Sequence, residues 1–194
     1  MHIILVHGIW SRPGHHFFPW LRKEMEKRGH RVTSARFPNP AYPDRFAWVT
    51  ELGRLVEDPA DTIIVAHSLG TFTTLRYLND VHSGAPFAHI ILVSGFGRDF
   101  VSKHIERILP PISRLANWFD VPPDFDHVRP MAHQWTCIHS TNDPLVPYTE
   151  GVWLAEQLHV PLVTEHRGHF TTWRLVWRLP SALEAVLKTK NLIQ

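Results

Sequence analysis

Short runs of apolar residues alternate along the chain with longer stretches in which apolar residues recur every three or four positions. Short runs that are apolar at nearly every position are typical of strands covered by helices on both faces of a sheet, and the longer spacing is typical of amphipathic helices. Trp173 and Trp177, four residues apart on the last such stretch, are interpreted as core-packing residues. The pattern predicts strands at residues 3–6, 32–37, 62–66, 89–93, 134–138 and 162–165, and helices at residues 17–28, 44–57, 69–79, 149–158 and 172–187.

The regular alternation of strand and helix predicts an α/β fold. We expect a mostly parallel, doubly wound sheet of about six strands with helices on both faces. Right-handed crossovers place the loops that follow the strands at one edge of this sheet, where such folds bind ligands. At 194 residues the chain is long enough for one domain with a sizeable core and short for two. A single domain spanning residues 1–194 is therefore expected.

The composition excludes several classes of function. A formal net charge of +2, with no run of lysine and arginine longer than two residues, predicts no nucleic-acid surface. The one cysteine, Cys137, excludes an intramolecular disulfide and is typical of a reducing compartment. The apolar start of the chain is too short for a signal peptide or a membrane span. We therefore expect a cytoplasmic protein.

Residues 62–70 join a buried strand to a helix through a tight turn at Ser68. This resembles the nucleophile elbow, G-x-S-x-G, in which the serine lies at a strained turn and its neighbours two positions away are small. Gly70 meets that steric need on one side, and Ala66 replaces glycine on the other. An ordinary serine N-cap has the same local pattern. The interpretation of Ser68 as a nucleophile therefore requires a base and an acid elsewhere in the chain.

A serine needs a base to take its proton, and elbow hydrolases carry the partners in the chain order serine, acid, histidine. Asp143 follows the strand at residues 134–138, in a loop stiffened by Pro144 and Pro147. His169 follows the last strand, after a glycine that lets the loop turn toward the site. We therefore predict that His169 is the general base and that Asp143 orients it.

Each partner taken alone has an ordinary structural interpretation. Asp143 fits a turn-forming Asn-Asp-Pro, and His169 fits a solvated loop histidine in a chain with 15 histidines. Their joint occurrence downstream of the elbow, in the required order, favours the triad. Weaker candidates for the acid are Glu165, Asp120, Asp124 and Asp126.

An oxyanion hole needs two backbone N–H donors. One is expected at Leu69, directly after the nucleophile. The other is expected at Ile9, in the loop after the first strand, with Trp10 as the alternative. Gly8 in this loop allows the backbone to come close to the elbow.

Residues 96–130 break the rhythm of strand and helix with five prolines and several bulky aromatic residues. We interpret this segment as a small insertion with one or two helices, close to the edge that carries Ser68. Its rings are able to narrow an apolar acyl pocket, while its paired prolines limit its freedom to open. The alternative is that these rings only pack the insertion onto the body of the domain. The candidate pocket residues are Trp10, Phe96, Phe100 and Trp118.

Other chemistry-bearing patterns are weaker. No P-loop motif occurs, and the glycines at residues 95–97 lack the third glycine of a dinucleotide fingerprint. His166 and His169 have a ligand-like spacing, but the chain is rich in histidine and offers no cysteine partner. We therefore expect neither a metal nor a cofactor.

Four segments together resemble the small α/β hydrolases related to retinoblastoma-binding protein nine and the bacterial YdeN proteins. The resemblance covers nearly the whole chain and implies an α/β-hydrolase fold, a serine hydrolase and a triad of Ser68, Asp143 and His169. No L-x-C-x-E segment surrounds Cys137. The retinoblastoma binding in the family's name is therefore not implied for this chain, and a protein partner stays unknown. The four segments are His-Gly at residues 7–8, Ala-His-Ser-Leu-Gly at 66–70, Ser-Thr-Asn-Asp-Pro-Leu-Val-Pro at 140–147 and Gly-His-Phe at 168–170.

Two functions from different classes stay open at this point. The first is an enzyme that cleaves a small carboxylic ester, or a thioester or amide, through an acyl-enzyme. The second is a non-catalytic protein-binding module that retains the hydrolase fold and a residual triad. The intact serine, acid and base favour the enzyme, and the rings of the insertion predict a preference for short acyl chains.

Overall fold

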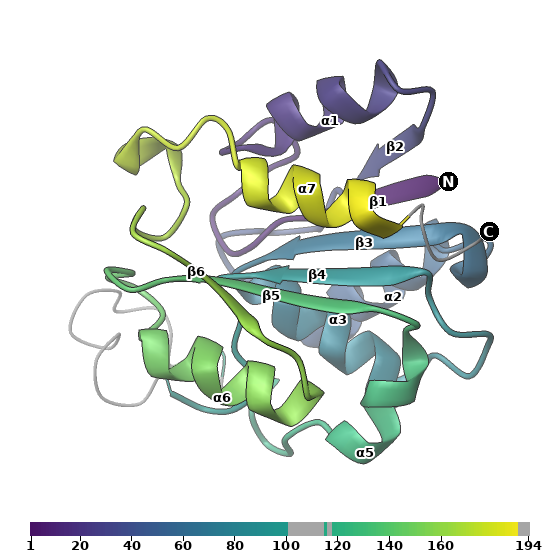
Figure 1. The fold of residues 1–194 in the computed structure, drawn as a ribbon. Coiled ribbons are helices and arrows are strands. Elements are labelled where there is room, and N and C mark those ends of the chain that lie inside the picture. Colours follow the sequence, from purple (N-terminus) through teal and green to yellow (C-terminus); the bar gives the residue numbers. More distant parts are fainter. Residues whose placement is uncertain (101–114, 116–117, 190–194) are drawn as a thin grey trace.

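A computed structural model of the protein describes residues 1–100, 115 and 118–189. Its centre is a six-stranded sheet in the order β2-β1-β3-β4-β5-β6, in which every neighbouring pair is parallel (Figure 1). The predicted α/β fold with a parallel sheet is thus confirmed. The strands are β1 (His2–Val6), β2 (Arg31–Ser34), β3 (Thr62–His67), β4 (His89–Val93), β5 (Trp135–Ser140) and β6 (Leu162–Glu165).

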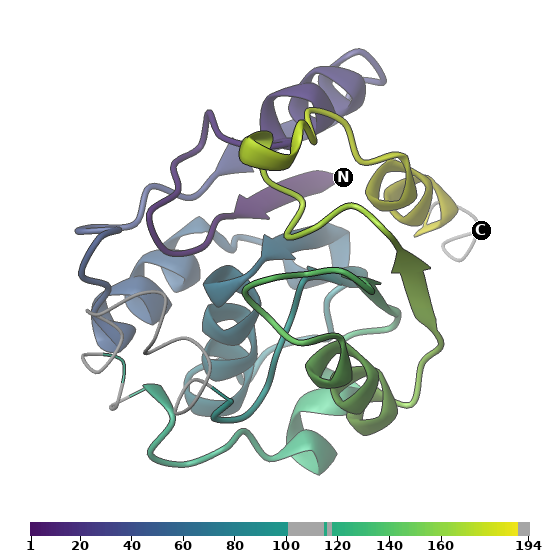
Figure 2. The ribbon, with the colours of Figure 1, turned by 90° about the vertical axis from the view of Figure 1, so that its left-hand side faces the viewer.

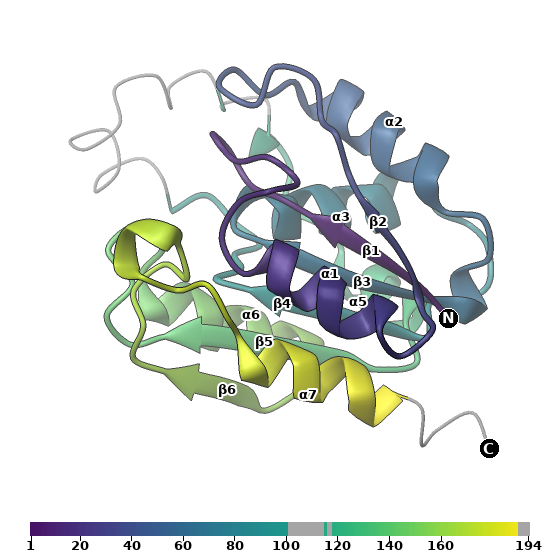
Figure 3. The same ribbon diagram turned by 90° about the horizontal axis from the view of Figure 1, so that it is seen from above.

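Helices cover both faces of the sheet. Figure 1 shows one group of helices above the sheet and a second group below it, and in Figure 3, seen from above, the first group lies in front of the strands. The first group is α1 (Phe18–Glu26) and α7 (Pro180–Thr189). The second group is α2 (Arg45–Leu55), α3 (Leu69–Asp80), α5 (Phe125–Val128) and α6 (Tyr148–Leu158).

The central strands are mostly apolar because each one supplies side chains to two cores. In β1, Ile4 and Val6 pack into the core beneath α2 and α3. Ile3 and Leu5 of the same strand point the other way, into the core beneath α1 and α7. Successive side chains of a strand alternate between its two faces. A strand that is covered on both faces therefore has no face that is exposed to solvent.

One predicted helix begins too early in the chain. The stretch at residues 172–187 contains a short 3₁₀ turn, Thr172–Arg174, then a loop, and α7 begins only at Pro180. Proline is tolerated in the first turn of a helix but not in its interior, so a helix through residues 172–187 would place Pro180 where it breaks the hydrogen bonding. Trp173 and Trp177 are correspondingly not core residues, since both side chains are exposed.

Part of the expected insertion at residues 96–130, namely residues 101–114 and 116–117, lies outside the described residues. Its described part holds α5 and a 3₁₀ turn at Arg129–Met131. The chain enters it from the carboxyl end of β4, at the edge of the sheet that Figure 2 presents to the viewer. This edge carries the loops that follow all six strands. The predicted site residues Ser68, Asp143 and His169 follow β3, β5 and β6 at this edge.

Candidate active site

Ser68 lies between β3 and α3 in a backbone conformation that residues with a side chain rarely adopt, with φ 56° and ψ −126°. Three hydrogen bonds hold this turn. The Ser68 N–H donates to the carbonyl of Val93 in β4 (3.0 Å), and the Ser68 carbonyl accepts from the backbone N–H and the hydroxyl of Thr71. The predicted strand, elbow and helix are therefore present, and the elbow is braced by the neighbouring strand.

The elbow leaves no room for larger neighbours. A Cβ atom added to Gly70 would lie 2.4 Å from the carbonyl oxygen of Val6, which is the backbone of β1. One added to Gly8 would lie 2.8 Å from Cβ of Ser68. Both glycines are thus needed for the close approach of the loop after β1 to the turn that carries Ser68.

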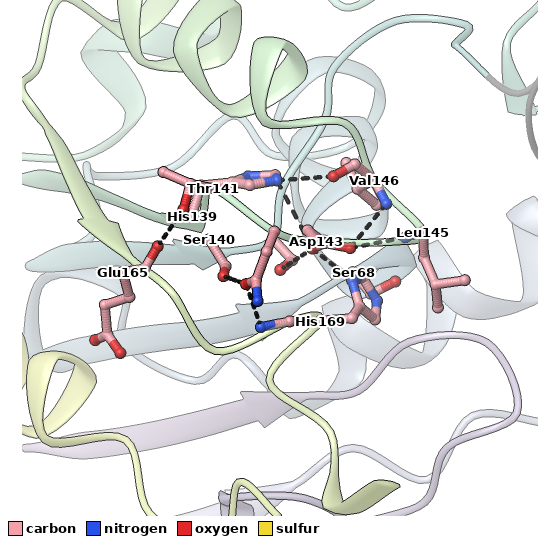
Figure 4. A network of polar contacts seen from close by, with 12 residues as sticks. Ser68, His139, Ser140, Thr141, Asp143, Leu145, Val146, Glu165 and His169 are labelled. Carbon is pink, nitrogen blue, oxygen red and sulfur yellow. Dashed lines mark hydrogen bonds and ion pairs between the residues drawn. The ribbon is translucent and has the colours of Figure 1, made fainter. Parts of the chain in front are cut away.

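Asp143 lies just beyond β5, with its side chain fully buried. Oδ1 accepts hydrogen bonds from the backbone N–H groups of Leu145 (2.9 Å) and Val146 (3.0 Å). Oδ2 accepts from the hydroxyl of Ser94 (2.7 Å) and faces Nδ1 of His169 at 2.8 Å (Figure 4). All these donors stabilise the ionised form of the carboxyl group.

Burial alone would raise the pKa of Asp143, but the nearby His169 and the hydrogen bonds lower that pKa well below its ordinary value. The carboxyl group therefore stays ionised and can only accept. Nδ1 of His169 must then carry the hydrogen of this contact, which leaves Nε2 free to accept a proton. The backbone carbonyl of His169 in turn accepts from Nε2 of His67 at 2.9 Å.

The loop that carries Asp143 and the loop that carries His169 are tied to each other by hydrogen bonds that the sequence did not reveal. The Asn142 side-chain oxygen accepts from the N–H of Gly168 (2.8 Å), and the Ser140 hydroxyl accepts from the N–H of Arg167 (2.7 Å). Gly168 has a positive φ of 59°, which its lack of a side chain permits. Ser94, which donates to Asp143, was also missed, because no motif singles out a serine after the fourth strand.

The other carboxylates considered for the acid are engaged elsewhere. Glu165 contacts the Ser181 hydroxyl and lies 3.7 Å from Arg167. Asp120 pairs with Arg45, while Asp124 accepts from the first N–H groups of α5 and Asp126 pairs with Arg129. Of the candidates in the sequence, Asp143 is the one that contacts His169.

Ser68 and His169 lie on the wall of one cavity, which has a volume of about 120 Å³. Trp10, Phe96 and Phe100 line the same cavity. The structure places Trp118, the fourth candidate pocket residue, elsewhere. Its ring is fully buried, stands edge-on against Trp48 and donates to the carbonyl of Pro43, so it is a core residue.

Leu69 and Ile9, the expected oxyanion donors, also line the cavity. Leu69 is the first residue of α3, where the N–H groups have no acceptor inside the helix. The backbone N–H of Trp10, the alternative to Ile9, donates to the carbonyl of Pro40 at 2.8 Å. That bond occupies the Trp10 group, so Ile9 is the better candidate.

A row of histidine rings lies beside the site. The ring centroids of His67 and His169 are 4.8 Å apart, and those of His16 and His67 are 5.4 Å apart. Burial, with the other rings nearby, lowers the pKa of His16 to about 4 and lowers the pKa of His67 well below its ordinary value. Nδ1 of His16 accepts from the N–H of Thr172 at 3.3 Å, which a neutral ring allows.

We expect the free energy of unfolding to fall as the pH is lowered from about 6.5 to about 4. In this range the folded protein keeps His16 neutral, whereas the unfolded chain protonates it at the ordinary pKa of about 6.5. Because the unfolded state binds more protons, each such ring lowers the free energy of unfolding by up to about 1.4 kcal/mol per pH unit. Urea unfolding at several pH values measures this slope.

The variant His16→Gln should reduce the slope, since glutamine does not titrate and its side-chain oxygen is able to accept from Thr172. The same change at His127, which is exposed, removes a histidine that is not buried and serves as the control. Equal slopes in wild type and His16→Gln would contradict the prediction.

Within the described ranges no group of three or more histidine, cysteine, aspartate or glutamate residues is arranged to hold a metal ion. In the same part of the chain, no helix is both long enough and apolar enough to cross a membrane.

Both the sequence and the fold match known hydrolases. A model of the family described as serine hydrolase matches residues 3–185. YdeN of Bacillus subtilis is 29% identical over 170 residues, which cover 87% of this chain and 85% of YdeN. The serine hydrolase RBBP9 of Rattus norvegicus is 27% identical over 158 residues, or 80% of this chain and 78% of RBBP9. The crystal structure of the B. subtilis ydeN gene product matches with a TM-score of 0.86 and 27% identity, over 98% of each chain.

Proposed function

Since the chain belongs to the serine hydrolase family, we propose that it cleaves carboxylic esters, or related thioesters or amides, through an acyl-enzyme on Ser68. The observation that carries this proposal is the contact of 2.8 Å between His169 Nδ1 and Asp143, with Ser68 and His169 on the wall of one cavity. A hydroxyl, an imidazole and a buried carboxylate in this order supply a nucleophile, its base and the group that orients the base.

In the first half of the reaction, Ser68 Oγ attacks the carbonyl carbon of the substrate, and its proton passes to Nε2 of His169. The carbonyl oxygen becomes an oxyanion and accepts hydrogen bonds from the N–H groups of Leu69 and Ile9. When this intermediate collapses, the bond to the leaving alcohol breaks and His169 gives that alcohol its proton. The acyl group stays on Ser68.

In the second half, a water molecule attacks the acyl carbon while His169 takes one of its protons. The new tetrahedral intermediate collapses, the carboxylic acid leaves, and His169 returns the proton to Ser68. Throughout, Asp143 keeps the ring of His169 in the tautomer that leaves Nε2 open and stabilises the imidazolium that forms. Its low pKa keeps it ionised while the imidazole changes charge.

The cavity favours a small acyl group. Its volume of about 120 Å³ lies below the range of about 300–1,000 Å³ that is usual for drug-sized ligands. Phe96 and Phe100, whose ring centroids are 4.7 Å apart, form part of its wall. A third ring, Phe72, stacks on Phe96 from the core, so this wall is backed by packed side chains.

Among p-nitrophenyl esters from acetate to dodecanoate, we expect kcat/KM to be highest for short acyl chains. An open apolar site gains up to about 0.8 kcal/mol for each buried methylene, whereas a cramped site loses this gain once the chain overfills it. Steady-state rates across the series measure the chain length at which kcat/KM stops rising. A steady climb to dodecanoate would show the cavity to be open and the proposal of a short-chain preference to be mistaken.

The variant Phe100→Ala should move the optimum to longer chains, because it removes a ring from the cavity wall. Phe46→Ala is a matched control, since Phe46 is an exposed phenylalanine that does not line the cavity. A profile that shifts equally in both variants would mean that Phe100 does not limit the chain length.

A further inference from the structure

The loop that replaces the first part of the predicted last helix exposes an unusual set of side chains. Trp173, Leu175 and Trp177 are 75%, 78% and 60% exposed. Arg174 and Arg178, which alternate with them, are exposed as well. We call these five residues the Trp–Arg ridge. Large apolar side chains gathered in this way usually mark a surface that binds something.

The ridge is held in place from below. Val176, which lies between its members in the sequence, and Leu179, which follows the last of them, are buried in the core that also holds α1 and α7. The N–H groups of Arg174 and Val176 both donate to the carbonyl of Thr171, at 3.0 and 3.1 Å. Leu175 is fixed at a positive φ of 58°, which is strained for a bulky residue. The buried neighbours and the backbone hydrogen bonds therefore hold the ridge side chains in their exposed positions.

The ridge stands at the mouth of the candidate active site. Trp173 lines the cavity together with Ser68 and His169. The side chain of Arg174 lies against Gly168, where an added Cβ would be 2.8 Å from Arg174 Cγ. The turn at residues 172–174 lies at the same edge of the sheet as the other loops of the site (Figure 2).

We propose that the Trp–Arg ridge docks the protein on an anionic lipid surface. Residues 171–180 contain two arginines and no acidic residue, so the charges next to the exposed apolar side chains along the chain are both positive. Tryptophan rings at the level of the headgroups and arginines paired with anionic lipids are the combination by which proteins bind a membrane surface without crossing it. Docking in this orientation turns the mouth of the cavity toward the lipid.

The charge of the ridge argues against a second copy of the chain as its partner. In a symmetric dimer the same patch meets itself, so the arginines of both copies would enter one desolvated contact to which residues 171–180 of neither copy bring an acidic partner. Anionic headgroups instead neutralise Arg174 and Arg178 while the rings enter the interface. This inference stands apart from the proposed reaction, because docking needs no catalytic residue.

Sedimentation with vesicles tests the proposal. We expect the full chain to bind vesicles of phosphatidylcholine mixed with phosphatidylglycerol, to bind phosphatidylcholine alone at least about tenfold more weakly, and to be released by salt. Replacing two ridge residues together, Leu175→Ser and Trp177→Ser, should lower the partition coefficient at least about tenfold. Arg178→Glu should weaken binding to the anionic vesicles only.

Matched controls lie at the opposite edge of the sheet. Val81→Ser removes an exposed apolar side chain at the end of α3, and Arg54→Glu makes the same charge change in the last turn of α2. Both should bind like wild type, as should Ser68→Ala. Circular dichroism and hydrolysis of a soluble short ester check that the ridge variants remain folded.

Three outcomes would overturn the proposal. The first is the absence of vesicle binding by wild type. The second is equal weakening by the ridge variants and the controls. The third is a dimer that light scattering detects in wild type and not in the ridge variants, which would assign the ridge to self-association.

Discussion

Replacing Ser68 by alanine is expected to remove all ester hydrolysis and all labelling by a fluorophosphonate. The reagent forms a covalent bond with an activated serine oxygen, and the structure places Ser68 on the wall of the cavity that His169 lines. Alanine keeps a Cβ atom, so the elbow retains its packing against Gly8 while losing the nucleophile. Mass spectrometry of wild type should find a single modified peptide, the one that contains Ser68, and none in the variant.

Ser140, in the loop that carries Asp143, provides the control. Ser140→Ala also deletes one buried hydroxyl, but that hydroxyl holds Asn142 and Arg167 and does not line the cavity. Its variant should still be labelled. Labelling that persists in Ser68→Ala would sink the assignment of the nucleophile, and wild type that turns over no ester and takes no label would favour a binding module.

The variant Asp143→Asn is expected to lower kcat by about 10⁴-fold while the protein stays folded, which is the loss that the equivalent change causes in a serine protease. An amide oxygen is able to accept from Leu145 and Val146 as the carboxylate does, so the loop keeps its shape. The amide nitrogen, a donor, then faces Nδ1 of His169. The ring must accept there, its hydrogen moves to Nε2, and it is no longer able to take the proton of Ser68.

Two further variants separate this effect from a general loss of structure. Ser94→Ala removes one hydrogen bond from a neutral hydroxyl to the same carboxylate oxygen and leaves the carboxylate in place, so it should cost far less than Asp143→Asn. Glu165→Gln should have nearly wild-type activity, since Glu165 contacts Ser181 and not the base. Near wild-type activity in Asp143→Asn combined with a loss in Glu165→Gln would show that the acid is wrongly assigned.

His169→Ala should abolish turnover altogether.

The sequence by itself determined the fold and the family. Strands buried on two faces must be apolar at successive positions, and this requirement is visible within a few residues, so the run at residues 89–93 coincides with β4. The elbow is equally local, because its steric demands fall on residues adjacent to Ser68. The family resemblance drawn from such short segments is confirmed by the match over residues 3–185.

The same local reasoning failed where two signals conflicted. The spacing of Trp173 and Trp177 imitates an amphipathic helix, while Pro180 belongs at the start of one. The proline predicts the start of the helix correctly, because α7 begins at Pro180. That the two tryptophans are exposed follows from the loop, which no periodicity describes.

Only the tertiary structure decided which groups touch. Asp143 lies 49 residues after Ser94 and 26 residues before His169 in the chain. The three residues come from three loops, which meet because β4, β5 and β6 are neighbours in the sheet. Trp118 shows the same limit, since its ring packs in the core and not on the cavity wall. Spacing along the chain predicts what a residue does to its own backbone, whereas a contact between distant loops depends on the order of the strands. Here that order brings Asp143 to His169.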